Sequence, residues 1–144
     1  MKEKGYTLVE LVVVIAIISI TLGTVLNSVN DIQKMTFRAS VREVEEALVY
    51  VRQAAVKTGR QYNVYCFSNR ILVRQGVNKP LYTIRLSRGT YIPDNITGKH
   101  LIFRGSMASP KTGTITLINK EINEYVDITV YIATGKIAVK YKSF

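Results

Sequence analysis

The sequence from Leu8 to Leu26 reads LVELVVVIAIISITLGTVL and carries one formal charge, on Glu10. A helix rises about 1.5 Å per residue, so this stretch would cover most of a hydrocarbon core about 30 Å thick. A secretory signal peptide has a shorter apolar region, about 7–15 residues long, and ends in a small-residue cleavage site. A core helix of a small domain would not normally be apolar on every side. We therefore predict a membrane-inserted helix.

Glu10 is the anomaly within this apolar stretch. A carboxylate deep in a membrane segment costs about 2.5–3.5 kcal/mol on insertion scales, so an acid at such a position indicates a function. The alternative is that Glu10 lies near the helix end and reaches the lipid headgroups. The residues that precede it, Lys2 and Lys4 and then Gly5-Tyr6-Thr7-Leu8-Val9, favour a functional role.

At these residues the sequence resembles the type IV pilin family, which includes pilins and the pseudopilins of type II secretion and competence systems. The family pattern is a short basic leader ending in Gly, an aromatic residue, three further residues, Glu and a long apolar run. Residues 1–5 match the leader, Tyr6 the aromatic residue and Glu10 the acid. The one departure is Tyr6, where Phe is the commonest residue.

The resemblance implies that a prepilin peptidase cleaves between Gly5 and Tyr6 on the cytoplasmic side and methylates the new amine of Tyr6. It also implies that Glu10 pairs with the Tyr6 amine of a neighbouring subunit during assembly. Opposite charges attract strongly at low dielectric, and an unpaired charge is costly there. Glu10 is therefore expected to set the register of the packing helices, as a recognition residue and not as a catalyst.

Past Leu26 the chain becomes amphipathic. Apolar residues recur at the spacing of one helical face, at Phe37, Val41, Val44, Leu48, Val51 and Ala55. Lys57 and Gly59 supply a cation in the last turn and a residue suited to follow it, so the helix should end near Thr58. We expect the apolar stripe to pack on the C-terminal domain, with a free coiled coil as the alternative.

After Gly59 the apolar pattern changes to a period of two, which indicates short strands. The expected inward positions are Tyr62/Val64/Cys66, Tyr82/Ile84/Leu86, Leu101/Phe103, Ile115/Leu117, Val126/Ile128/Val130/Ile132 and Ile137/Val139/Tyr141. Such strands predict an antiparallel β-sheet or a small sandwich, and the long helix supplies the second layer of an α+β fold. The expected organisation is a leader at 1–5, a transmembrane and assembly helix at 6–26, its amphipathic continuation at 27–58 and a β-rich domain at 59–144.

This C-terminal half adds a second resemblance. Phe103-Arg-Gly105, Gly113-Thr-Ile-Thr-Leu117 and Gly135-Lys-Ile-Ala-Val139 are similar to the C-terminal pattern of the GspH/FimT pseudopilins. The last strands are also similar to the ComGD-type pseudopilins of Gram-positive competence systems. The resemblance implies a minor pilin-like subunit of a type II secretion or type IV pilus-type machine. It would be anchored by a single pass in the cytoplasmic (inner) membrane, with its C-terminal domain extracytoplasmic, and assembled with other pilin subunits into a short pilus or pseudopilus.

The residue inventory argues against an enzyme. The chain has one His, His100, and one Cys, Cys66, and it lacks a close pair of acids in the β-rich domain and a Gly-rich phosphate loop. We expect no catalytic residue, no metal site and no cofactor. Cys66 lies at an inward strand position and is expected to be a buried thiol, whereas His100 is expected in a loop. Asn95-Ile96-Thr97 matches a glycosylation triplet, a pattern that often arises by chance.

Positive charge is concentrated in the middle of the chain. The formal net charge is +10, and residues 51–120 hold 12 Lys and Arg against one acid, Asp94. Phosphate backbones are attracted to such surfaces without sequence readout, and exposed aromatic rings can stack on bases. The candidate DNA contacts are Arg74, Arg85, Arg88, Arg104, Lys136, Lys140 and Lys142. Charge alone does not choose among polyanions, so a basic face that repels neighbours or meets acidic subunits is the alternative.

Three functional hypotheses remain open on the sequence. The first is a processed, assembled minor pilin-like subunit. The second is a competence pseudopilin of the same fold that contacts DNA through its basic face. The third is an unprocessed single-span membrane protein with an extracellular binding domain. Cleavage separates the third hypothesis from the others, and salt-dependent DNA binding separates the second from the first.

Overall fold

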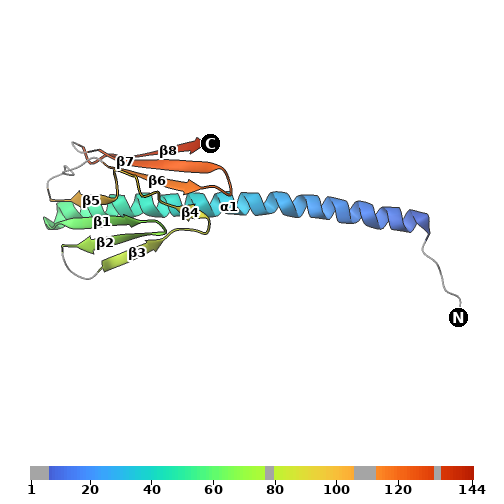
Figure 1. Cartoon of the computed structure of the whole chain (residues 1–144). Coiled ribbons are helices and arrows are strands. Elements are labelled where there is room, and N and C mark those ends of the chain that lie inside the picture. The colour runs from blue at the N-terminus through green and yellow to red at the C-terminus, as the bar shows by residue number, and fades with distance from the viewer. Residues whose placement is uncertain (1–6, 77–79, 106–112, 132–133) are drawn as a thin grey trace. The chain divides into compact units, whose positions relative to one another are not determined.

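The computed structural model describes residues 7–76, 80–105, 113–131 and 134–144, apart from the side chains of residues 24–28. Gly5, Tyr6 and Ile132, which carry expectations from the sequence, lie outside the described residues. One helix, α1 (Leu8–Thr58), precedes the strands (Figure 1). The strands are β1 (Tyr62–Phe67), β2 (Arg70–Gln75), β3 (Pro80–Arg85), β4 (Thr90–Tyr91), β5 (His100–Phe103), β6 (Gly113–Asn119), β7 (Glu124–Val130) and β8 (Ile137–Ser143). The chain divides into two compact units, Met1–Met35 and Thr36–Phe144.

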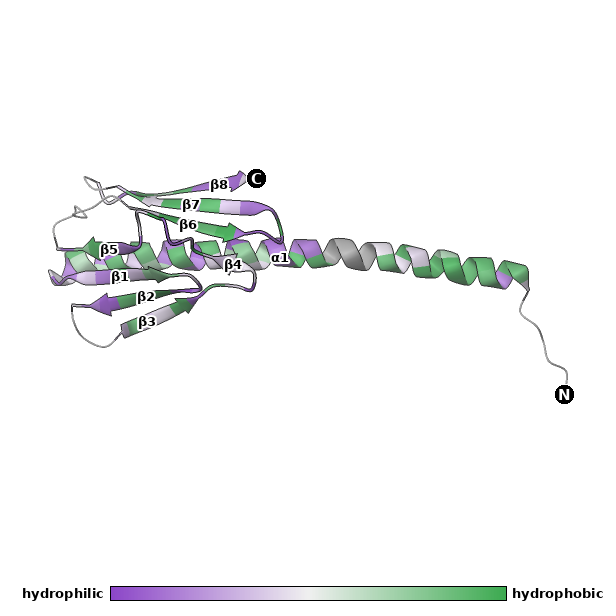
Figure 2. Cartoon of the chain, in the orientation of Figure 1, coloured by the Kyte–Doolittle hydropathy of each residue, from purple (hydrophilic) through white to green (hydrophobic). Residues whose placement is uncertain are grey.

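The first unit contains the apolar N-terminal part of α1. Its large side chains from Leu8 to Leu22 are exposed, and Figure 2 shows hydrophobic residues along this part of the helix. The hydroxyl groups within it are satisfied by the helix itself, because Ser19 donates to the carbonyl of Ile15 and Thr21 to that of Ile17. No helical stretch among the residues whose side chains the structure describes is both long enough and apolar enough to cross a membrane.

In the second unit, α1 buries one stripe of side chains. The six apolar residues expected to share a face, from Phe37 to Ala55, are all buried, which confirms the spacing argument. The helix ends at Thr58. The next residue, Gly59, has a φ of 66°, the left-handed conformation that commonly follows a helix end. The Gly59 amide donates to the Ala55 carbonyl at 3.0 Å, and this bond closes the last turn.

The strands form two antiparallel four-stranded sheets. Their orders are β3-β2-β1-β5 in the first sheet and β4-β6-β7-β8 in the second. Figure 1 shows both sheets beside the C-terminal half of α1. Inward residues of both sheets and the helix stripe make one core, in which Val64, Leu101 and Leu117 are fully buried. The expected α+β fold, a long helix followed by antiparallel sheets, is confirmed.

Two local expectations were wrong. Tyr141 was placed on the inner face of the last strand, but it is 53% exposed. Burial decreases along β8 from Ile137 onward because this strand lies at the edge of its sheet. His100 was expected in a loop but begins β5, where it pairs with Tyr65.

Candidate functional site

Glu10 closes the N-terminal turn of α1 through Thr7. The Thr7 amide donates to Glu10 Oε2 at 3.1 Å and the Thr7 hydroxyl to the same oxygen at 3.2 Å. In return, the Glu10 amide donates to Thr7 Oγ1 at 3.3 Å. Thr at the N-cap with Glu three residues later is a capping box, in which two side chains satisfy amides that the helix leaves open. The sequence analysis missed this local role, although the Thr-x-x-Glu spacing signals it.

Position and exposure leave Glu10 accessible to a partner. It lies in the first turn of α1, where the helix dipole favours a negative charge, and its side chain is exposed. The carboxylate is therefore held by a local hydrogen-bond network without being enclosed. Gly5 and Tyr6, the expected processing residues, lie outside the described part of the chain.

The outer face of the first sheet brings two arginines together. Arg70 of β2 is directly opposite Arg85 of β3 on one side and Phe67 of β1 on the other. The Arg70 guanidinium lies 5.2 Å from the centre of the Phe67 ring, and all three side chains are exposed. Like charges directly opposite on neighbouring strands are unfavourable, so this pair is suited to an anion that lies between them.

Arg74 lies on the same face but is partly buried. It is opposite Asn63 of β1, and its Nε is a buried nitrogen with no partner among the described atoms. Asn63 donates from Nδ2 to the Gly76 carbonyl at 3.1 Å, and its Oδ1 lies 3.3 Å from His100 Nε2. The His100 ring in turn stacks on Tyr65 with centroids 4.3 Å apart. Arginines and aromatic rings thus share this sheet face.

The other basic candidates lie elsewhere. Arg88 and Arg104 are exposed, one between β3 and β4 and the other after β5. Lys136, Lys140 and Lys142 lie in or just before β8 of the second sheet. Lys142 Nζ is 2.8 Å from Asp127 Oδ2, so its charge is balanced locally.

The ion pair shifts the pKa of both of its members, Asp127 and Lys142. Partial burial alone would raise the pKa of Asp127, but hydrogen bonds from Lys142 and Thr116 and the charges of Lys142 and Lys140 together lower it. The Asp127 hydrogen bond raises the pKa of Lys142, and the Asp127 charge adds to this effect. Asp127 is therefore ionised at neutral pH, with Thr116 Oγ1 donating to its Oδ1 at 2.7 Å.

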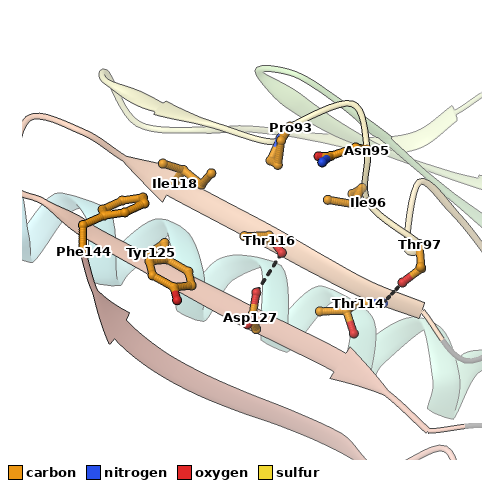
Figure 3. A pocket seen from close by; sticks show the side chains of 10 residues that line it. All are labelled: Pro93, Asn95, Ile96, Thr97, Thr114, Thr116, Ile118, Tyr125, Asp127 and Phe144. Carbon is orange, nitrogen blue, oxygen red and sulfur yellow. Dashed lines mark hydrogen bonds between the residues drawn. The ribbon is translucent and has the colours of Figure 1, made fainter.

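A cavity of about 630 Å³ opens beside Asp127 on the second sheet (Figure 3). Its lining combines apolar, aromatic, hydroxyl, amide and carboxylate side chains: Pro93, Asn95, Ile96, Thr97, Thr114, Thr116, Ile118, Tyr125, Asp127 and Phe144. Sequence periodicity did not reveal this site, because its residues come from a loop, two strands and the C-terminal residue.

Metal and thiol chemistry find little support in the described residues. No group of three or more His, Cys, Asp or Glu side chains in this part of the chain could hold a metal. Cys66 is buried, and this burial raises the pKa of its thiol to about 12. A thiol with such a pKa is not a nucleophile at neutral pH.

Comparison with known proteins addresses the two parts of the chain separately. Residues 1–26 match the family model of the prokaryotic N-terminal methylation motif. The structure is similar to the type IV minor pilin FimU of Pseudomonas aeruginosa, with a TM-score of 0.59 and 14% identity over 75% of this chain and 90% of that one. The fold is pilin-like.

A second solved structure agrees with this result. The pilin-like chain is similar to the minor pseudopilin EpsH from the Type 2 Secretion System of Vibrio cholerae, with a TM-score of 0.56 and 14% identity over 72% of this chain and 95% of that one. No curated protein matches the sequence significantly. A prokaryotic N-terminal methylation motif and a pilin-like fold thus occur in one chain.

Proposed function

We propose that this chain is a minor pilin-like subunit, or pseudopilin, that a prepilin peptidase processes and that assembles into a short pilus. The machine would be of the type II secretion or type IV pilus type. The observation that carries the proposal is the methylation motif at residues 1–26 in a chain whose remaining part has the pilin-like fold. Cleavage between Gly5 and Tyr6, followed by methylation, would leave a methylated Tyr6 amine four residues before Glu10.

Before assembly, the subunit would be anchored in the membrane. Residues 6–26 would hold the chain in the cytoplasmic membrane as a single span, with the domain that follows outside the cytoplasm. Lys2 and Lys4 agree with a cytoplasmic leader, since positive residues favour that side. The large apolar side chains from Leu8 to Leu22 are exposed in the isolated chain, and lipid or neighbouring helices would cover them.

Glu10 would then act by exchanging partners. In the isolated chain its Oε2 accepts two hydrogen bonds from Thr7. On assembly, the methylated amine of Tyr6 in a neighbouring subunit would offer a positive charge in a medium of low dielectric. A charge-assisted bond there is stronger than a neutral one. One carboxylate would therefore first cap its own helix and later position the neighbouring helix.

Intact-mass analysis of the full chain tests the proposed processing. The chain is expressed in cells with and without a prepilin peptidase, and its mass is compared between the two. Loss of residues 1–5 together with one added methyl group, seen only with the peptidase, is the expected result. An unprocessed chain in both cells would refute the proposal and leave a membrane-anchored binding domain.

A competence role with DNA contact is the second candidate. The exposed row of Phe67, Arg70 and Arg85 favours it, because two guanidinium groups lie beside an aromatic ring on one sheet face. The stretch around this row has one acid, Asp94, whose carboxylate is 3.2 Å from Lys99 Nζ. Phosphates could bind between the arginines while a base stacks on the ring. Binding of DNA that weakens as salt rises tests this candidate.

A further inference from the structure

The cavity on the second sheet is lined by two strands, a loop and two aromatic rings. Its floor is the outer face of β6 and β7, with Thr114, Thr116 and Asp127 pointing into it (Figure 3). Residues 93–97 form one wall. Tyr125 and Phe144 close one end, with ring centroids 4.9 Å apart. Several hydrogen-bonding groups and two aromatic rings therefore converge on one space.

The loop wall is fixed at both ends. At one end, the Gly98 amide donates to the Thr114 carbonyl at 3.0 Å, and the Thr114 amide donates to Thr97 Oγ1 at 3.1 Å. A Cβ atom on Gly98 would come within 2.7 Å of that carbonyl oxygen, so glycine permits the close approach. At the other end, Tyr91 of β4 pairs with Ile118. Between these attachments the chain arches over the position of Thr116.

Between its two attachments, the segment from Tyr91 to Gly98 leaves the backbone groups of Thr116 at the edge of β6 open to a ligand. Successive residues of a strand turn their amides and carbonyls to opposite sides. Because Thr114 bonds across this edge, Thr116 turns its backbone groups the same way, toward the cavity. An extended peptide could pair only with Thr116 at this edge. Thr114 is already bonded to residues 97–98, and Ile118 is paired with β4. This limits pairing by a peptide strand.

The charge of the lining favours a neutral ligand. Asp127 is the acid of the lining, and Lys142 balances it from 2.8 Å. An anion would meet the carboxylate, and a cation would compete with Lys142. Hydroxyl groups of a ligand can instead donate to Asp127 and exchange hydrogen bonds with Thr116 and the Asn95 amide.

We propose that this cavity, an open groove on the outer face of β6 and β7, binds a neutral oligosaccharide. Its volume of about 630 Å³ exceeds what one sugar ring fills and lies in the usual range of small-molecule sites. The apolar faces of the sugar rings would pack on the exposed Phe144 ring, which itself packs on Tyr125. The sugar hydroxyls would bond to Asp127, Thr116 and Asn95. This site is independent of the proposed assembly through Glu10, so either proposal can fail alone.

Saturation-transfer NMR on the full chain tests this site. The chain is held in dodecylphosphocholine micelles, which carry no sugar, and the probes are maltotriose, cellotriose and chitotriose. We expect transfer to at least one of them, and a loss of most of that signal in Asp127→Asn and in Phe144→Ala. The Phe144 side chain is 65% exposed, so its replacement by Ala leaves the core intact. Tyr131→Ala, an exposed aromatic outside the groove, is the matched control and should bind as the wild type does.

Three results would overturn the oligosaccharide site. One is the absence of transfer to all three sugars. Another is equal transfer in the wild type, Asp127→Asn and Phe144→Ala, because binding would then lie elsewhere. The third is transfer to the neutral peptide Ala-Thr-Val-Thr-Ala together with none to the sugars, which would assign the groove to extended peptides. Near-UV circular dichroism of each variant establishes that it is folded.

Discussion

At the scale of single residues, Glu10 combines a structural and a proposed functional role. Its capping box with Thr7 would stabilise the start of α1 in any subunit, assembled or not. A substitution that removes the side chain therefore removes two things at once, the cap and the charge. The two roles separate only when each is removed without the other.

Three variants make this separation, and incorporation into filaments is the quantity measured. Glu10→Gln keeps an oxygen that can cap the helix but loses the charge, so we expect incorporation to be abolished. Thr7→Ala loses the capping hydroxyl but keeps the charge, at a cost of about 0.5–2 kcal/mol to the helix end, and should still assemble. Glu10→Val should insert into the membrane at least as well as the wild type but should not assemble.

Membrane extraction of each variant is the control for insertion. The expected pattern is failure of both Glu10 variants with near-normal assembly of Thr7→Ala. Normal assembly of Glu10→Gln would contradict the charge-pairing account. Failure of Thr7→Ala with success of Glu10→Gln would show that the cap is what assembly requires.

The Asp127–Lys142 pair makes stability depend on pH. Because the pKa of Asp127 is lowered in the folded chain, its contribution is present above its unfolded pKa of about 3.9 and is lost as pH falls through the lower folded value. Asp127→Asn should thus lower the melting midpoint by a few degrees at most at about pH 7, and by less at about pH 2. Lys142 behaves oppositely, because its raised pKa keeps its contribution until pH rises past its unfolded value of about 10.4.

Thermal unfolding of the full chain in micelles measures this effect. Asp94→Asn is the matched control, since its side chain is 91% exposed and its pair with Lys99 is longer, at 3.2 Å. It should leave the midpoint unchanged at both pH values. A deficit of Asp127→Asn that is undiminished at low pH would show that shape, not charge, explains the loss.

At the scale of elements, the buried stripe of α1 carries much of the core. Leu48 is 2% exposed within it, whereas the adjacent Val49 is 37% exposed. Leu48→Ala should lower the free energy of unfolding by about 2–5 kcal/mol, because it removes buried methyl groups and leaves a cavity. Val49→Ala should change it by about 0.5 kcal/mol or less. Denaturant titration of the full chain measures both, and equal losses would contradict the burial assigned to this stripe.

The first sheet supplies the prediction for DNA. If phosphates bind along its outer face, Arg70→Gln and Arg85→Gln should each weaken DNA binding and reduce the salt dependence by about one released ion. Arg42→Gln makes the same charge change on an exposed position of α1 and should have little effect. Fluorescence anisotropy with labelled DNA at several salt concentrations measures this. Equal losses in all three variants would mean that net charge alone acts.

Much of the element pattern was predictable from the sequence. The helix stripe, the helix end at Thr58 and most inward strand positions followed from periodicity, because burial of one face repeats along the chain. The two-residue strand β4 was not predicted, since Thr90 is a buried polar residue that bonds to Asn119. Hydrophobic alternation carries no signal for such a strand. Nor does it show that Tyr141 is exposed, because the end of an edge strand extends past the core.

The candidate sites were predictable to different degrees. Glu10 stands out in the sequence because an acid within an apolar run is costly, and the proposed processing residues Gly5 and Tyr6 stand out by their spacing from it. The sequence shows how many basic residues there are, but it does not show which of them lie side by side on the folded surface. Pairing of Arg70 with Arg85 depends on strand register, and the balance of Lys142 by Asp127 depends on strand order. The groove needs a loop, two strands and the C-terminal residue together, so no local pattern indicates it.

At the scale of the whole molecule, the chain consists of an apolar helical unit and a folded unit with its own core. Among the described side chains of the first unit none is buried, and the large apolar ones from Leu8 to Leu22 are exposed. Such a division suits a subunit that is stored in a membrane and stabilised by its neighbours in a filament. The folded unit would then present its sheets, with their basic row and groove, to the exterior.

Mass spectrometry of purified filaments tests this account most directly. Filaments sheared from cells that contain a prepilin peptidase are digested, and the N-terminal peptide of this chain is quantified against the same preparation from cells expressing Glu10→Gln. The account predicts a peptide that begins with methylated Tyr6 in the first preparation and its absence from the second. A chain that stays in the membrane fraction with residues 1–5 attached, or equal amounts in both filament preparations, would contradict it.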